Sequence, residues 1–231
     1  MNTNISIFVI KNKNNFQIFI FFLMKKIFFP DFELNIDNFT IKYLTLADVC
    51  SISKYYLSNF SHFKNSLPKR SKDFYAIDNI YNILENEIFQ REKQIGLRLY
   101  IIDNGFKNKE NLLINEYSSK LEEIKIIGDI SLYNIGMSNY YAAISYEIDK
   151  DYASKGIMSK VFNHLLDYLH SENSEDIFLK QLVSFVPIDN GKSKQFCLNN
   201  KFEYFTKLEN YAEINGKIKN HFVFIKNLDI F

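Results

Sequence analysis

Hydrophobic and polar positions recur along the chain in a pattern that predicts an α/β fold. Residues 39–44 alternate as a strand does, and Thr45-Leu-Ala-Asp48 has the form of a capping box that begins a helix reaching to about residue 60. Residues 61–73 are polar and predict a loop. A second helix is predicted over 76–93, because apolar residues recur there at helical spacing: Ile77, Ile80, Tyr81, Leu84 and Ile88.

The rest of the chain predicts further strands and two more helices. The polar connection 104–123 begins with Asn104-Gly105 and predicts a long hairpin loop, and Asn215-Gly216 predicts a tight turn between the last two strands. No internal repeat and no Pro/Gly/Ser-rich linker divides the chain. We therefore expect a single α/β domain with a mixed central sheet of about seven strands, in the order βααβββαβαββ, and helices on both faces. The strands are predicted over 97–103, 124–133, 142–148, 177–186, 202–211 and 221–226, and the helices over 159–170 and 191–200.

The first part of the chain is predicted to be an extension, residues 1–38, that precedes a domain over 39–231. The apolar run 16–24 is about half of the roughly 20 residues that span a bilayer. Positive charge follows this run instead of preceding it, and no small-residue cleavage site is present, so neither an anchor nor a signal peptide is favoured. Because Met24-Lys-Lys-Ile27 resembles an ordinary bacterial start, we expect residues 1–23 to be either untranslated or loosely attached.

Composition narrows the class of protein. The chain has 231 residues and 47% hydrophobic residues, enough for a sizeable core. Its 28 basic and 27 acidic side chains give a net charge of +1, which predicts no bulk attraction to nucleic acid or to a membrane. Only Cys50 and Cys197 are present, without zinc-ligand spacing, so we expect neither disulfides nor a structural metal. These features favour a cytoplasmic protein.

Residues 144–158 are the most informative for function, because they predict a strand, a short loop and the start of a helix. The backbone N–H groups of Ser154 to Met158 would be the unpaired donors of a helix N-terminus, where the helix dipole favours a phosphate. Gly156 would let the backbone approach that phosphate closely. The spacing matches neither a P-loop nor a GxGxxG motif, and an ordinary tight turn is the alternative for this segment alone.

The wider context of this loop carries a resemblance to a known family. It is preceded by Lys54-Tyr-Tyr-Leu-Ser-Asn59, Leu67-Pro-Lys-Arg70 and Ile126-Ile-Gly128-Asp-Ile-Ser-Leu132, and followed by Pro187-Ile-Asp-Asn190-Gly-Lys-Ser193 and Asn200-Lys-Phe202. In this order, over residues 39 to 228, the chain resembles the GNAT superfamily of acyl-CoA N-acetyltransferases. Within that superfamily it is similar to the ribosomal-protein alanine N-acetyltransferases.

The resemblance implies that acetyl-CoA is the acetyl donor and that the loop binds its pyrophosphate. The cofactor-binding residues it implies are Ile148, Ala153, Ser154, Lys155, Gly156, Ile157, Met158 and Asn190. Three positions depart from the family pattern: Ala153 and Ser154 replace Gln or Arg followed by Gly, and Lys201 replaces Gly. We expect a serine in a helical conformation still to present its N–H to phosphate. Cys197 occupies a position where some relatives have a tyrosine that acts as general acid, so that acid is not expected here.

Two residues are candidates for the chemistry of direct attack by an amine. Glu147 lies on the strand that leads into the loop, and we expect it to remove a proton through water, an ordinary solvated glutamate being the alternative. Ser193, together with Asn190, would bind the departing thiolate or the CoA arm, the alternative being helix capping. The aromatic residues Tyr55, Tyr56, Phe60 and Phe63 predict either an acceptor pocket or part of the core.

Three functions stay open from the sequence. The first is acetylation of a protein N-terminal amine, with a ribosomal protein as the substrate that the resemblance implies; such an amine, with a pKa of about 7.7–8.0, is far more often neutral than a lysine. The second is acetylation of a small amine such as a polyamine or an aminoglycoside. The third is binding of CoA or of a protein partner without catalysis. An acidic acceptor cleft would favour the second, and an open groove the first.

Overall fold

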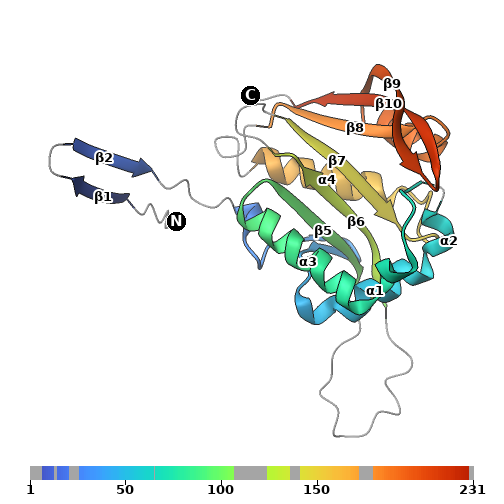
Figure 1. The fold of residues 1–231 in the computed structure, drawn as a ribbon, viewed down its shortest axis with the longest axis horizontal. Coiled ribbons are helices and arrows are strands. Elements are labelled where there is room, and N and C mark those ends of the chain that lie inside the picture. Colours follow the sequence, from blue (N-terminus) through green and yellow to red (C-terminus); the bar gives the residue numbers. More distant parts are fainter. Residues whose placement is uncertain are drawn as a thin grey trace, which may run out of the picture.

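The computed structural model describes residues 7–12, 15–20, 26–64, 66–106, 124–135, 141–171 and 179–228. The main sheet is mixed and has eight strands in the order β3-β4-β5-β6-β7-β8-β10-β9. Figure 1 shows its twist. The strands are β3 Glu33–Ile36, β4 Phe39–Lys42, β5 Gly96–Asp103, β6 Ile126–Tyr133, β7 Tyr141–Ile148, β8 Gln181–Pro187, β9 Glu203–Ile214 and β10 Lys217–Asn227. The α-helices are α1 Val49–Ser58, α2 Phe60–Phe63, α3 Ile77–Glu92, α4 Ile157–Ser171 and α5 Gly191–Asn199.

The predicted fold class is confirmed, with one strand more than the seven expected. The additional strand is β3, which pairs antiparallel with β4. Residues around it, which the sequence pattern placed in the N-terminal extension, belong to the core: Ile27 is fully buried, and Phe32 and Ile36 are 5% and 1% exposed. The alternation of polar and apolar residues in this strand is only four residues long, which is why it was not predicted.

Part of the predicted extension also has secondary structure. Ile7–Asn12 (β1) and Asn15–Ile20 (β2) pair antiparallel and form a separate two-stranded sheet. The expectation that residues 1–23 are loosely attached or untranslated stays a prediction. Most of the long connection predicted over 104–123, namely residues 107–123, lies outside the described residues.

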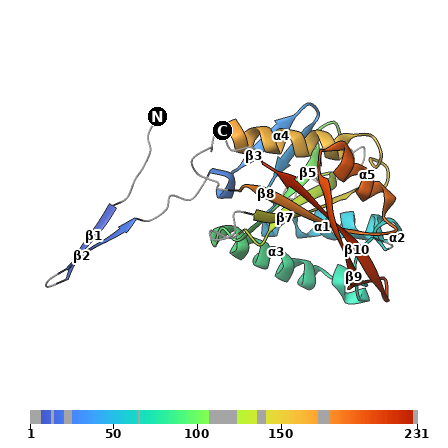
Figure 2. The same cartoon turned by 90° about the horizontal axis from the view of Figure 1, so that it is seen from above.

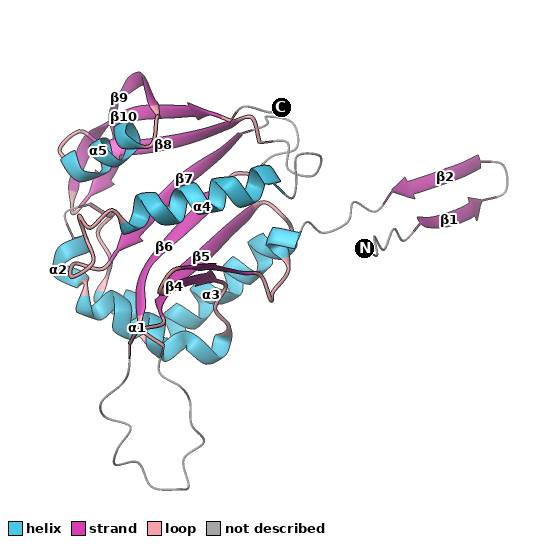
Figure 3. Ribbon diagram, turned by 180° about the vertical axis from the view of Figure 1, so that it is seen from behind, coloured by secondary structure: helices cyan, strands magenta, loops and turns pink. Residues whose placement is uncertain are grey.

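Helices cover the sheet on both faces, as the view in Figure 2 shows. One face carries α4 and α5, and Figure 3 shows α4 lying across the strands. The helix is amphipathic, with Val161 and Phe162 almost completely buried against the sheet. The other face carries α1 and α3, whose buried residues Ile52, Tyr56 and Ile80 form a second core cluster with residues of β5 and β6.

The C-terminal end of the sheet is a hairpin that ends in an exposed strand. The β9–β10 turn contains Asn215 and Gly216, with φ angles of 50° and 77°, as the Asn-Gly pattern predicted. β10 lies between β8 and β9, so β9 is the edge strand. Most side chains of β9 are exposed on both faces, and Phe205 is 67% exposed.

None of the helices in the part of the chain that the structure describes is long and apolar enough to cross a membrane.

Candidate active site

The sheet opens at its centre, between β7 and β8. These strands form the only parallel pair among the described strands of the sheet, and their pairing covers three positions, ending at Ala143 opposite Val183. Beyond this point β7 stays paired with β6, and β8 with β10, while the two strands diverge from each other. The facing edges of residues 144–148 and 184–187 therefore carry backbone N–H and C=O groups without a ladder partner.

A cavity of about 500 Å³, which we call the β7–β8 cavity, lies at this opening. Its lining comes mainly from the divergent ends of β7 and β8, the α2 segment, the loop before α4 with the first turn of that helix, and α5, and Tyr133 at the end of β6 adds to it. Of the ten predicted site residues, nine lie in the lining: Glu147, Ile148, Ala153, Ser154, Gly156, Ile157, Met158, Asn190 and Ser193. Lys155 is the exception, and its ammonium instead lies 5.5 Å from the centre of the Tyr152 ring.

The loop before α4 has an unusual backbone conformation at two residues. Gly156 has a φ of 77° and lines the cavity, and a Cβ placed on it would meet no described atom within 4 Å, so the space beside it is open. Ser154 has a φ of 61°. The expectation of a helical conformation at this serine is therefore wrong, because its backbone is left-handed. A left-handed backbone is natural for glycine, which is the residue that the family pattern has at this position. When left-handed and right-handed backbone conformations alternate along a loop, successive N–H groups point toward one concave side of the loop, and such a side can bind an anion.

The loop is fixed from both sides by polar contacts. The amide of Asn59, at the end of α1, donates to Asp149 at 2.8 Å, and its carbonyl oxygen accepts from the Lys150 N–H at 2.9 Å. Both side chains are almost completely buried. On the other side, the Tyr152 hydroxyl donates to Asp103 at 2.6 Å. The loop position therefore depends on α1 and β5, which are distant in sequence.

Asn190 and Ser193 lie together at the start of α5. The Asn190 side chain accepts a hydrogen bond from the Ser193 N–H at 3.1 Å, so the capping alternative for Asn190 is present in the structure. The Ser193 carbonyl oxygen in turn accepts from the Tyr146 hydroxyl at 3.4 Å. Tyr146 lies on β7, lines the cavity and packs on Phe196 with ring centres 4.1 Å apart. Burial raises the pKa of its hydroxyl above the usual value, so it is a neutral hydrogen-bond donor.

Glu147 faces the opposite side of the sheet from Tyr146, toward α1. One oxygen, Oε1, accepts from Arg70 Nη2 at 3.1 Å, and the Glu147 side chain is 11% exposed. The Arg70 guanidinium is held over two rings, 4.7 Å from the centre of Tyr56 and 4.3 Å from that of Phe74. Glu147 is therefore not an ordinary solvated glutamate but a largely buried carboxylate with a rigid partner.

Other candidates from the sequence have structural roles. Cys197 is fully buried, and burial raises its pKa to about 11, so the thiol is unreactive near neutral pH. Tyr55 and Tyr56 are core residues, whereas Phe63 belongs to the core and also lines the cavity. Within the described ranges, no three His, Cys, Asp or Glu side chains gather as metal ligands would.

Lys201, the third departure from the family pattern, ends α5. It has a φ of 60°, and the flanking bonds form a Schellman motif: Phe202 N–H donates to Cys197 O at 2.9 Å and Lys201 N–H to Leu198 O at 3.2 Å. The fold at this point does not require glycine, but it places a lysine in the left-handed region. Such a residue costs about 1–2 kcal/mol relative to an ordinary backbone conformation.

Lys201→Gly is therefore expected to stabilise the protein by about 0.5–1 kcal/mol, because glycine adopts this conformation without strain. For a chain of this length the melting temperature should rise by about 1–4 °C, measured by thermal unfolding. The matched control is Lys194→Gly, inside α5, where glycine should destabilise by about 1 kcal/mol. A loss of stability in Lys201→Gly would show that the lysine side chain stabilises the fold by more than its backbone strain destabilises it.

A second cavity of about 500 Å³, which we call the α3 cavity, lies between α3 and the sheet. It shares Tyr133 and Ser145 with the β7–β8 cavity, so the two meet at the centre of β7. Its polar lining includes Asn82, Asn86 and Gln90 of α3. Of the described residues that line it, only Glu87 is acidic, and its Oε1 is 3.0 Å from Arg98 Nη1.

Several residues of these cavities have no signal in the sequence that points to a site. Lys192 and His62 line the β7–β8 cavity, the first near the start of α5 and the second on α2. Burial lowers the pKa of His62, and Lys192 lowers it further, so its ring is neutral at neutral pH. The one sequence signal that could have identified Tyr146 as a site residue is its position next to Glu147.

The sequence and the structure were compared with known proteins. No model of a protein family and no curated protein matches the sequence significantly. The structure is similar to the ribosomal-protein-S5-alanine acetyltransferase from Vibrio fischeri, with 21% identity, a TM-score of 0.70, and coverage of 85% of this chain and 97% of that one.

Two further solved structures are similar over nearly their whole length. The microcin C7 self-immunity acetyltransferase, in complex with acetyl-CoA and AMP, is 21% identical with a TM-score of 0.67, covering 84% of this chain and 94% of that one. RimL, a ribosomal L7/L12 α-N-protein acetyltransferase in complex with coenzyme A, is 15% identical with a TM-score of 0.70, covering 87% and 100%. The chain therefore has the fold of these GNAT acetyltransferases, and the resemblance expected from its sequence is confirmed at the level of the fold.

Proposed function

We propose that the protein is an acetyl-CoA-dependent N-acetyltransferase that acts on the N-terminal amine of a polypeptide. The observation that carries this proposal is the meeting of two cavities at Ser145: one at the opening of the sheet, the other against α3. An acetyl donor in the first and an acceptor in the second would bring their reacting groups together at the centre of β7. The acetyltransferase activities of the similar structures support this assignment.

The β7–β8 cavity fits the donor. Acetyl-CoA has an anionic pyrophosphate, and an arm of secondary amides that carries the thioester. The N–H groups of the loop around Ser154 and Gly156 suit the pyrophosphate, and Lys192 in the lining adds positive charge. The unpaired edge of β7 beyond Ala143 can hydrogen-bond the amides of the arm as a strand would.

The α3 cavity fits a peptide better than a polyamine or an aminoglycoside. A small polycation needs uncompensated carboxylates, but Glu87 is already neutralised by Arg98. The side-chain amides of Asn82, Asn86 and Gln90 are neutral donors and acceptors, which match the backbone of an extended peptide. This lining is not the acidic cleft that would favour a small cationic amine.

The reaction then needs two proton movements, and the chain supplies groups for both. Glu147, which borders the cavity, accepts the proton of the acceptor ammonium, directly or through water. The neutral amine attacks the thioester carbonyl carbon, a C–N bond forms and the C–S bond breaks, and the surplus proton of the attacking nitrogen passes to the thiolate, which leaves as the CoA thiol. The hydroxyl of Ser193, in the lining, is the donor that we assign to the departing thiolate, since the Tyr146 hydroxyl already donates to the Ser193 carbonyl oxygen.

The proposal is tested by incubating the full chain with acetyl-CoA and a panel of amines, and detecting products by mass spectrometry. Peptides with a free N-terminal Ala or Ser are expected to be acetylated. An N-terminally blocked peptide with one lysine should react on the order of 100-fold more slowly at neutral pH, because few lysine amines are neutral there.

The other two functions appear as distinct outcomes of the same panel. Efficient acetylation of spermidine or kanamycin, without peptide products, would show that the acceptor is a small amine. Acetyl-CoA binding by calorimetry without transfer to any amine would show a binding protein. Absence of acetyl-CoA binding by the folded chain would overturn the acetyltransferase proposal itself.

A further inference from the structure

Buried polar atoms without hydrogen-bond partners gather at one place under β6 and β7. They are Oδ2 of Asp129, Oε2 of Glu147, the hydroxyl of Tyr55 and Nη1 of Arg70. An unpaired buried polar group costs about 1–3 kcal/mol, and more when it is charged. Such a cluster therefore requires a physical explanation beyond packing.

The two carboxyl groups in this cluster come from cross-strand neighbours. Asp129 on β6 is directly opposite Glu147 on β7 in the strand register, which places their Cβ atoms about 4.5–5.5 Å apart. Each has one oxygen engaged: Asp129 Oδ1 lies 3.5 Å from Arg98 Nε, and Glu147 Oε1 lies 3.1 Å from Arg70 Nη2. No side chain in the described part of the chain donates to the other oxygen of either group.

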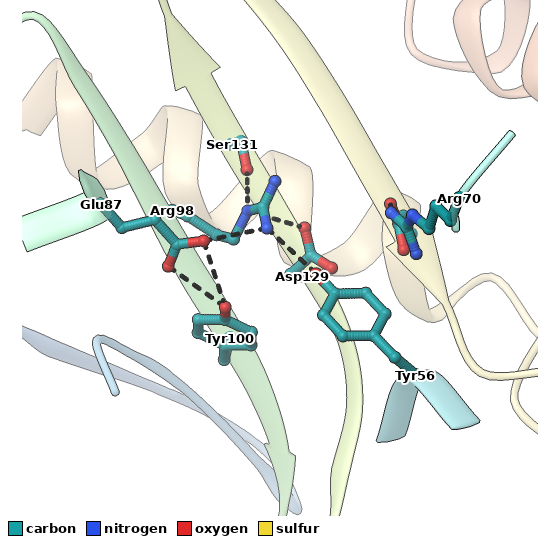
Figure 4. A network of polar contacts seen from close by, with 8 residues as sticks. Tyr56, Arg70, Glu87, Arg98, Tyr100, Asp129 and Ser131 are labelled. Atoms are coloured by element: carbon teal, nitrogen blue, oxygen red, sulfur yellow. Dashed lines mark hydrogen bonds and ion pairs between the residues drawn. The ribbon is translucent and has the colours of Figure 1, made fainter. Parts of the chain in front are cut away.

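The charges around the pair do not balance unless one carboxyl holds a proton. Figure 4 shows Arg98 between the acidic residues Glu87 and Asp129, with Arg70 nearby. Glu147 pairs with Arg70, so two arginines serve three acidic residues. Burial raises the pKa of Asp129 to about 8, with Glu147 and Glu87 raising it and Arg98 and Arg70 lowering it. The nearby tyrosines also have raised pKa values and are neutral: Tyr55, Tyr56 and Tyr100.

We propose that Asp129 is a neutral carboxylic acid whose Oδ2–H donates a hydrogen bond to Oε2 of Glu147. One proton on Asp129 thus gives both unpaired oxygens a partner and removes the excess negative charge. Arg70 and Asp129 would then hold the Glu147 carboxylate from two sides at the edge of the β7–β8 cavity. Asp129 is a positioning residue that acts through Glu147, so its role in catalysis rests on the proposed function.

The proposal predicts different activities for two variants whose new side chains are of nearly the same size. Asp129→Asn keeps a donor at this position, through its side-chain N–H, and should retain kcat/KM within about 3-fold of wild type at neutral pH. Asp129→Leu has no donor and should lose at least about 10-fold. Equal losses in both variants would overturn the proposal and show that the ionised carboxylate, as the partner of Arg98, is what matters. Thermal unfolding checks that each variant is folded.

The pH dependence gives a second readout that a purely structural role would not change. Above about pH 8, wild type should lose the Asp129 proton, and Glu147 then faces a second negative charge; Asp129→Asn cannot ionise. The acceptor amine titrates in the same way in both assays, so the ratio of kcat/KM of Asp129→Asn to that of wild type does not contain its contribution. This ratio should rise about 10-fold between neutral pH and about pH 9, since a group with this pKa keeps its proton in about one molecule in ten there. A constant ratio would contradict the proposal.

Infrared spectroscopy of the full chain without substrates tests the protonation independently of any activity. We expect a carboxylic-acid C=O band at neutral pH that shifts on ¹³C labelling of aspartate carboxyls, titrates near pH 8 and is absent in Asp129→Asn. Glu203→Gln, at the exposed start of β9, should keep the band. Absence of the band in wild type would overturn the proposal, whether or not the chain acetylates amines. The band without acetylation of any amine would mean that only the proposed function had failed.

Discussion

Gly156→Glu is expected to weaken acetyl-CoA binding by about 100-fold, which is among the largest effects of any single substitution. The φ of 77° at this position costs a residue with a side chain about 1–2 kcal/mol, and this cost falls on binding because the unliganded loop can relax and acetyl-CoA must restore the conformation. The new carboxylate also projects into the open space beside the loop, where the pyrophosphate is proposed to bind, and repels it. Together the two effects amount to about 3 kcal/mol, or two factors of ten. Isothermal titration of acetyl-CoA into the full chain measures the change.

The chain contains a matched control for this experiment. Gly216, in the β9–β10 turn, has the same φ of 77° and equally open space around a Cβ, but it does not line either cavity. Gly216→Glu should therefore show similar backbone strain in thermal unfolding and unchanged affinity for acetyl-CoA. Gly156→Ala separates strain from charge and should bind about 10-fold more weakly than wild type. Affinity within 3-fold of wild type in Gly156→Glu would place the pyrophosphate elsewhere.

Glu147→Gln is expected to lower kcat for an N-terminal peptide by at least about 100-fold, with the affinity for acetyl-CoA unchanged. Glutamine keeps the shape of the side chain and still accepts the hydrogen bond from Arg70 through Oε1. It cannot accept a proton from the acceptor ammonium, and general base catalysis contributes about 10²–10⁴-fold in rate. Steady-state kinetics with saturating acetyl-CoA, together with calorimetry, separates the chemical step from binding.

The same chemical change at an exposed site serves as the control. Glu209 on β9 is 72% exposed and pairs only with Lys207 at the surface, so Glu209→Gln should leave kcat unchanged. If kcat of Glu147→Gln stays within about 3-fold of wild type, Glu147 is a partner of Arg70 and not the proton acceptor. A loss of acetyl-CoA affinity in parallel with kcat would instead indicate that the loop after β7 had moved.

The sequence predicts elements well where one face of an element is continuously apolar. The helix expected over 159–170 is found over 157–171, because its apolar residues follow one stripe that packs against the sheet. The Asn-Gly turn at 215–216 is likewise a local feature with a strong conformational preference. β3 was missed because its alternation of polar and apolar residues is only four residues long, and the buried Ile27 before it belongs to no periodic pattern.

The candidate site likewise has one part that a single stretch of sequence predicts and another that depends on residues far apart in the sequence. The loop around Gly156 is contiguous and could be recognised from its own residues, although the left-handed conformation of Ser154 could not. Arg70 and Glu147 are separated by 77 positions, and only the packing of the loop after α2 onto the sheet brings them together. The Asn59 contact with Asp149 spans 90 positions and has no periodicity that a single sequence reveals.

Because β10 lies between β8 and β9, the sheet is completed only when the last of the described strands has been synthesised. Before residues 217–227 emerge, β8 has one side without its partner, and β9 has no strand to pair with. β9 carries exposed aromatic side chains, Tyr204 and Phe205 among them, and an unpaired strand of this kind is a template for pairing with other chains. A nascent chain is therefore vulnerable to aggregation until β10 inserts. A chain terminated before residue 217 would keep that vulnerability permanently and would become a substrate for chaperones and proteases.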